Sequence, residues 1–219
     1  PMKRLLAAGS GSIYQICKVF RDGESGRLHN PEFTLIEWYR VGFDHLALME
    51  EVEALVRKAL AGQVALLDTQ RLSYGAAFER YTGLNPHSAC VEDLARAARA
   101  HGIEPPASLD PHGEEDAWRD LLLTHIIEPQ LGQGRLSFLY DYPASQASLA
   151  RVRAGNPPVA ERFELYLNGV ELANGFHELT ESAEQRMRFE RHEQNECDSE
   201  VPDRSRHCEF CGALLFIAR

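Results

Sequence analysis

Two glutamates flank a tight turn in the stretch ERFELYLNGVELANG (161–175), and their side chains could hold a metal ion. The Asn168-Gly169 dipeptide between them favours a type I′ turn, so the flanking segments are predicted to pair as a β-hairpin. Glu164 and Glu171 are then diagonal neighbours with Cβ atoms about 7 Å apart, within reach of one Mg²⁺. Such like charges repel each other, and a Mg²⁺ with a phosphate ligand would relieve the repulsion. Two solvated glutamates on an open face of the sheet would give the same spacing.

The predicted turn also fixes a register for this hairpin. Leu167 is expected opposite Val170, and the next pairs follow by alternation. One face of the hairpin should therefore carry Glu164, Tyr166, Glu171 and Ala173.

An earlier pair of predicted strands, 12–21 and 32–39, is joined by the turn-rich segment 22–31. Alternation along the second strand places an aromatic ring, an acid and a phenol on one face, together with a leucine: Phe33, Leu35, Glu37 and Tyr39. The ring could stack on a planar ligand and the acid could hold a polar one. Donors suited to a polyphosphate occur at the end of the first strand and in the loop, at Arg21, Arg27, His29 and Asn30. An ordinary charged β-loop would show the same residues.

A third group follows Glu171. If the strand continues past Gly175, then Asn174, Phe176 and Glu178 alternate onto one side. A carboxylate and an aromatic ring in that arrangement suit an ammonium group, through an ion pair and a cation–π contact.

The remaining elements must position these side chains. Helical spacing of apolar residues predicts a helix from Asp44, as N-cap, to about Leu60. Further helices are predicted over 91–101, 114–128 and 182–192, and a strand over 135–141. Residues 61–135 otherwise carry little signal.

Composition narrows the class of protein. The chain has 219 residues, of which 44% are apolar, so it can bury a sizeable core. Its formal net charge of -10 argues against nucleic acid, tRNA included, as a partner bound through a basic surface. No apolar run reaches the roughly 18–20 residues of a membrane span, and five cysteines do not form a disulfide framework. A cytoplasmic location is expected.

Several long motifs agree with one family. The stretch FRDGESGRLHNPEFTLIEWYR (20–40) resembles motif 2 of class II aminoacyl-tRNA synthetases, and NPEFT followed by E-x-Y resembles their lysine-type branch. The stretch ELANGFHELTE (171–181) is similar to the amino-acid-binding strand of that branch. PASQASLA (143–150) points to the stand-alone ligases that modify elongation factor P. The resemblance covers about residues 3–192.

The resemblance implies an α+β fold, a class II synthetase-like catalytic core with a mainly antiparallel sheet flanked by helices. It makes Arg21 the catalytic residue, holding the α-phosphate of ATP. The other ATP-binding residues would be Asp22, Gly23, Glu24, Asn30, Phe33 (stacked on adenine), Glu171 and Leu172. The substrate pocket would comprise Glu37, Tyr39, Asn174, Phe176 and Glu178, and Mg²⁺ would bind Glu164 and Glu171. Gly23 stands where the family usually has an acid.

The implied activity is that of an ATP-dependent ligase. It would activate lysine or β-lysine as an adenylate and transfer it to a lysine of elongation factor P. The catalytic core of a lysyl-tRNA synthetase and a non-catalytic ATP-binding paralogue remain alternatives. The family forms homodimers through motif 1, which lies upstream in the family and is not found in this sequence. Motif 3, a Gly-rich strand followed by an Arg-bearing helix, is not found either.

The sequence after the core differs in character. Residues 1–193 are expected to form a partial catalytic core, and 194–219 an atypical tail, unstructured or frame-shifted. This tail carries the residue types of a zinc site at Cys197, His207, Cys208 and Cys211. His207 abuts Cys208, which makes joint ligation awkward.

Overall fold

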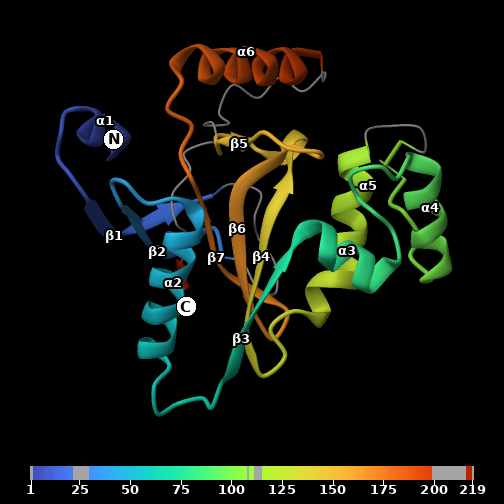
Figure 1. The fold of residues 1–219 in the computed structure, drawn as a ribbon, viewed down its shortest axis with the longest axis horizontal. Helices are drawn as coiled ribbons and strands as arrows, with labels where there is room; N and C mark the ends of the chain where they lie inside the picture. Colours follow the sequence, from blue (N-terminus) through green and yellow to red (C-terminus); the bar gives the residue numbers. More distant parts are fainter. Residues whose placement is uncertain (1, 22–29, 108, 111–114, 199–215, 219) are drawn as a thin grey trace.

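The computed structural model describes residues 2–21, 30–107, 109–110, 115–198 and 216–218. The elements follow the order α1 (Met2–Ala7), β1 (Ile13–Phe20), β2 (Glu32–Tyr39), α2 (His45–Ala59), β3 (Leu67–Ser73), α3 (Tyr74–Thr82), α4 (Val91–Ala100), α5 (Glu115–Leu122), β4 (Arg135–Pro143), β5 (Val152–Arg153), β6 (Val159–Leu167), β7 (Val170–Phe176), α6 (Ser182–Asp198) and β8 (Phe216–Ala218). Figure 1 shows the strands at the centre with helices around them. The expected α+β fold with a mainly antiparallel sheet is confirmed.

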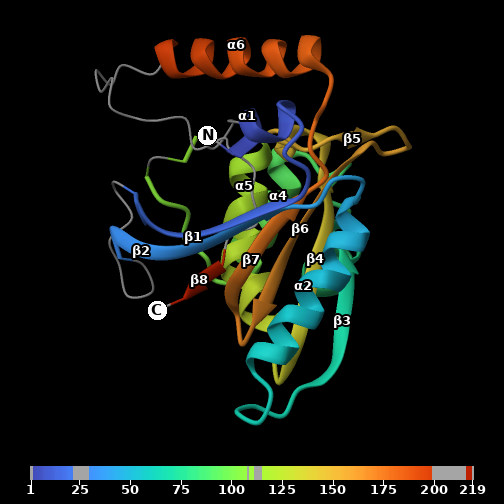
Figure 2. The same cartoon turned by 90° about the vertical axis from the view of Figure 1, so that its left-hand side faces the viewer.

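The strands form two sheets. In the larger one the order is β3-β4-β6, with β7 and the short β5 both on the far edge of β6. Among the described strand pairs, β3–β4 is the parallel one and the others are antiparallel. The smaller sheet has the order β1-β2-β8 (Figure 2). There Ile217 of β8 lies opposite Leu35, so the last described residues of the chain pair with β2.

Two apolar clusters cover the two faces of the larger sheet. On one face residues of α3, α4 and α5 share an apolar cluster with Leu139 and Tyr166, in which α3 packs on β4 and α4 packs on α5. On the other face α2 packs against Phe138, Phe163 and Leu165. Because both faces are covered, β4 and β6 are buried along most of their length instead of alternating between buried and exposed.

The predicted elements around the site are present. Asp44 caps α2, and its carboxylate accepts a hydrogen bond of 2.8 Å from the Ala47 amide. Asn168 and Gly169 both have positive φ, at 51° and 73°, as a type I′ turn requires. The hairpin of β1 and β2 also has the expected face, since Glu37 pairs with Gln15 and Phe33 with Val19.

Other elements differ from the prediction. The helix expected over 114–128 ends at Leu122 and continues as a π turn and a 3-10 turn. The elements α1, β3, α3, β5 and β8 were not predicted. The helix α6 extends to Asp198, so the expected boundary between core and tail falls inside it. The division of the chain at that boundary stays a prediction.

Candidate functional site: carboxylates along β2, β6 and β7

On β2, Glu37 is held in a defined orientation by two neighbours. The Gln15 amide donates to Glu37 Oε2 at 2.8 Å, and the Tyr39 hydroxyl donates to Oε1 at 3.0 Å. Both neighbours share its face of the hairpin, since Gln15 is the residue directly opposite on β1. Fixed carboxylate oxygens of this kind can bind a cationic or hydrogen-bonding ligand with defined geometry.

On β6, Glu164 is buried and accepts several hydrogen bonds. The Arg162 guanidinium donates to its Oε1 at 2.5 Å and the Tyr166 hydroxyl to its Oε2 at 2.5 Å. The Asn174 amide of β7 lies 3.5 Å from Oε1. The Arg162 guanidinium also lies 4.3 Å from the centre of the Tyr142 ring, which restricts its movement.

The register of the second hairpin corrects the sequence prediction. Leu167 pairs with Val170 and Tyr166 with Glu171, as expected, but a bulge at Leu172 shifts the pairs beyond it. Glu164 therefore lies opposite Asn174, and not opposite Ala173. The extra residue of a bulge reverses the alternation that follows it.

The bulge changes which side chains share a face. Ala173 does not lie beside Glu164 and Glu171 as predicted; it is buried in the cluster under α2. Asn174 and Phe176 instead share the face of Glu164 and Glu171. In a regular strand they would lie on the opposite face from Glu171. The predicted metal-binding residues and the predicted ammonium-binding residues are thus neighbours on one surface.

The carboxylates on this surface repel one another. The pKa of Glu171 is raised to about 8, first by protein atoms that displace water around it and second by the charge of Glu164. Glu171 nevertheless remains an exposed residue, so solvent screens part of this effect. Burial, and then the charge of Glu164, also raise the pKa of Glu128. The Arg21 guanidinium lies close enough to Glu171 for its positive charge to lower the pKa of Glu171.

This electrostatic arrangement fits a divalent cation. Glu164 and Glu171 offer oxygen ligands, which Mg²⁺ prefers, and a cation between them would remove the repulsion. Within the described residues no group of three or more His, Cys, Asp or Glu side chains could hold a metal ion by itself. Mg²⁺ at Glu164 and Glu171 would therefore take its other ligands from phosphate or water, as is usual for this ion.

Glu178 follows β7 and lies at the far end of the same surface. The Lys3 ammonium of α1 donates to Glu178 Oε2 at 2.9 Å and lies 5.6 Å from the centre of the Phe176 ring. Burial raises the pKa of Glu178, the Lys3 charge lowers it, and the charge of Glu37 raises it. Glu37 therefore lies close enough to Glu178 for its charge to act on it, although Glu37 belongs to β2 and Glu178 follows β7.

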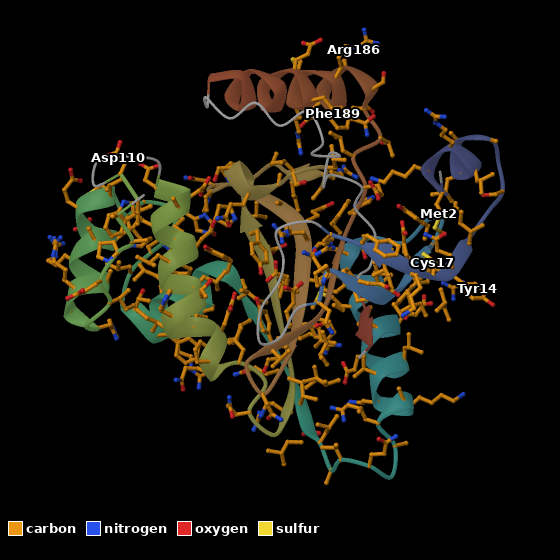
Figure 3. All side chains as sticks on the ribbon, turned by 180° about the vertical axis from the view of Figure 1, so that it is seen from behind. Met2, Tyr14, Cys17, Asp110, Arg186 and Phe189 are labelled. Atoms are coloured by element: carbon orange, nitrogen blue, oxygen red, sulfur yellow. The ribbon has the colours of Figure 1, made fainter. Side chains whose placement is uncertain are left out.

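Two cavities border this surface. A cavity of about 500 Å³ is lined by Tyr39, Phe176 and Glu178, three of the five predicted substrate residues, together with the turn between β2 and α2. A cavity of about 960 Å³ contains Glu164 and Glu171, and extends between α5 and α6. Phe189 of α6 lines the second cavity, and Figure 3 shows its side chain directed toward the body of the protein, whereas Arg186 points away.

The other predicted nucleotide residues are placed as follows. The Arg21 guanidinium lies 5.3 Å from the centre of the Phe33 ring, so the predicted phosphate-binding and adenine-stacking groups are adjacent. Asn30 is exposed, and Leu172 is the bulged residue. Asp22, Gly23 and Glu24 lie outside the described residues, as do Arg27, His29 and the side chains proposed for zinc.

Three residues of the site were not predicted from the sequence: Gln15, Lys3 and Arg162. Gln15 lies directly opposite Glu37 on β1. Lys3 lies in α1, a short helix that the sequence did not predict. Arg162 lies two positions before Glu164 on the same strand, and this alternation of Arg and Glu was a usable signal for an ion pair.

The chain matches a known protein family over most of its length. The family profile for "tRNA synthetases class II (D, K and N)" matches residues 2–210. The chain belongs to this family. Within the described residues no helix of this synthetase-family chain is long and apolar enough to cross a membrane.

Three relatives within the family carry the same name, elongation factor P–(R)-β-lysine ligase. The protein of Vibrio cholerae is 49% identical over 188 residues, covering 86% of this chain and 56% of the relative. That of Mannheimia succiniciproducens is 46% identical, covering 97% and 64%. That of Haemophilus ducreyi is 45% identical, covering 97% and 63%. The chain thus spans about three fifths of the length of these relatives.

Proposed function

We propose that this chain carries the ATP- and lysine-binding site of a cytoplasmic ligase that activates lysine or (R)-β-lysine and transfers it to a lysine of elongation factor P. The observation that carries the proposal is the bulge at Leu172. It brings the Glu164–Glu171 pair onto the same face as Asn174 and Phe176. An acidic metal-phosphate site and an ammonium site are then contiguous, as the activation of an amino acid by ATP requires.

In the first step the carboxylate of the amino acid attacks the α-phosphorus of ATP, and pyrophosphate leaves. Arg21 would neutralise charge that develops on the α-phosphate, and the face of Phe33 would stack on the adenine ring. Mg²⁺ held by Glu164 and Glu171 would supply Lewis-acid stabilisation of the phosphate oxygens. Arg162 and Tyr166 fix the orientation of Glu164 through their hydrogen bonds.

The amino-acid pocket would supply position and selectivity. Glu37, fixed by Gln15 and Tyr39, and Glu178 would hold the substrate ammonium, with Phe176 beside it. A neutral analogue would leave a partly buried carboxylate unpaired, which is costly. In the second step an acceptor amine attacks the carbonyl carbon of the adenylate, and AMP leaves.

The names and the 45–49% identity of the relatives support elongation factor P as the acceptor. Formation of a homodimer remains a prediction. The acceptor is tested by incubating the chain with ATP, Mg²⁺ and either lysine or (R)-β-lysine, together with elongation factor P or tRNA. We expect the intact mass of elongation factor P to rise by one lysyl group. Charging of tRNA instead would identify a tRNA synthetase core, and modification of neither acceptor would contradict the proposal.

A further inference from the structure

Lys3 makes both contacts that the proposed pocket offers to a substrate ammonium. Its Nζ donates to Glu178 Oε2 at 2.9 Å and lies 5.6 Å from the centre of the Phe176 ring. Both members of the ion pair are partly shielded from water, with side-chain exposures of 28% and 29%. An ion pair at this depth is screened less than one on the open surface.

The contact uses only one of the two carboxylate oxygens. Among the described residues, Lys3 is the hydrogen-bond partner of Glu178, through Oε2, and Oε1 has no such partner. A carboxylate can accept hydrogen bonds at both oxygens, so a second ammonium can bind Oε1 while Lys3 stays in place. Glu37 has its own partners in Gln15 and Tyr39 and does not bind Lys3.

The charges of the pocket also indicate a role for Lys3. Glu37 and Glu178 together carry two negative charges, and Lys3 carries one positive charge. These three groups therefore sum to one net negative charge, which can pair with one ammonium group of the substrate. Without the Lys3 charge, the two neighbouring carboxylates would repel each other, which would favour protonation of one of them.

We propose that Lys3 is a positioning residue of the amino-acid pocket, which orients Glu178 through Oε2 and keeps it ionised so that Oε1 can bind the substrate ammonium. This inference rests on the proposed function for the identity of the ligand. The contrasting arrangement is one in which Lys3 occupies the substrate's place and must leave before the substrate binds.

The charges around Glu178 support the arrangement in which Lys3 positions Glu178. Within the part of the chain that the structure describes, two charged groups act on it, Lys3 from α1 and Glu37 from β2. The adjacent His177 is directed elsewhere, since its Nδ1 lies 2.7 Å from the Glu161 carboxylate. Burial and Glu37 raise the pKa of Glu178, and among the described residues Lys3 is the group that lowers it. Loss of the Lys3 charge should therefore protonate Glu178 at a higher pH.

The direct test is an NMR titration of the Glu178 carboxyl in the full chain and in two variants. Lys3→Met keeps the length of the side chain and removes the charge, and Lys3→Arg keeps the charge. We expect the pKa of Glu178 to rise by about one unit in Lys3→Met and to stay near the wild-type value in Lys3→Arg. An unchanged pKa in Lys3→Met would overturn the proposal. This titration needs no catalysis, so its outcome is independent of whether the wild type proves to be a ligase.

Binding of lysine as a function of pH separates the two arrangements. If Lys3 positions Glu178, Lys3→Met should bind lysine roughly tenfold more weakly below the new pKa and recover affinity above it. If Lys3 blocks the site, the same variant should bind lysine more tightly at every pH, which would refute the positioning role. Thermal unfolding of each variant shows whether the fold is retained. Absence of lysine binding by the wild type would contradict the proposed function. The NMR titration would then show by itself whether Lys3 keeps Glu178 ionised.

Discussion

Replacing Glu171 with glutamine should stabilise the protein at alkaline pH. In the folded chain the pKa of Glu171 is about 8, against an ordinary value of 4.5. The pKa is raised because nearby protein atoms displace water from the carboxyl group and because Glu164 is negatively charged. Between these two pH values the folded state holds a proton that the unfolded chain has released. Stability should therefore fall as the pH rises through this window. Glutamine resembles the protonated carboxyl group and avoids this loss.

The size of the effect follows from the same values. A difference between 4.5 and 8, at about 1.36 kcal/mol per pKa unit, sets an upper limit of roughly 5 kcal/mol. Glu171 is an exposed residue, so solvent screening reduces the expected effect to about 1 kcal/mol. In a chain of this length that free energy corresponds to about 2–4 °C in Tm.

Thermal unfolding by circular dichroism, at about pH 4.5 and about pH 9, measures the difference. The Tm of Glu171→Gln should equal that of the wild type at the lower pH and exceed it by about 2–4 °C at the higher pH. Millimolar Mg²⁺ should raise the Tm of the wild type at the higher pH and not that of the variant. Glu50→Gln, at an exposed position of α2, is the matched control and should show neither effect. A variant that is less stable than the wild type at alkaline pH would refute the reasoning.

Four further substitutions test the structure and the substrate pocket. Asp44→Ala removes the N-cap of α2 and should cost about 1 kcal/mol, seen as a Tm lower by about 2–4 °C. Gly132→Ala places a Cβ 2.6 Å from the Leu167 Cα, so it should cost more than about 2 kcal/mol in urea unfolding. Gly134→Ala, also at positive φ but with no atom within 4 Å, should cost about 1 kcal/mol, and equal losses at the two sites would contradict the predicted clash. Glu178→Gln should weaken lysine binding about tenfold to a hundredfold by calorimetry, and unchanged affinity would exclude an ion pair with the substrate.

The sequence predicted the local elements that carry strong signals. The type I′ turn at Asn168-Gly169 and the capped helix after Asp44 are specified by a few adjacent residues, and both are present. The face of β2 that carries Glu37 follows from simple alternation in a strand without irregularities.

The features that depend on distant parts of the chain could not be predicted. The bulge at Leu172 has no Gly or Pro to mark it, and its position follows from how β7 pairs with β6. The pairing of β3 with β4 is parallel and joins segments that are separated in sequence by α3, α4 and α5, so no local pattern indicates it. Lys3 meets Glu178 across 175 positions of sequence, and that contact depends on the packing of α1.

The most direct test of the proposed function is ATP–pyrophosphate exchange by this chain with lysine and with (R)-β-lysine. The arrangement of Arg21, the Glu164–Glu171 pair and the ammonium pocket predicts Mg²⁺-dependent exchange with at least one of the two amino acids. Exchange should be lost in Glu178→Gln and retained in Glu50→Gln. No exchange with either amino acid while ATP still binds, or undiminished exchange in Glu178→Gln, would contradict the assignment of a lysine-activating site to this surface.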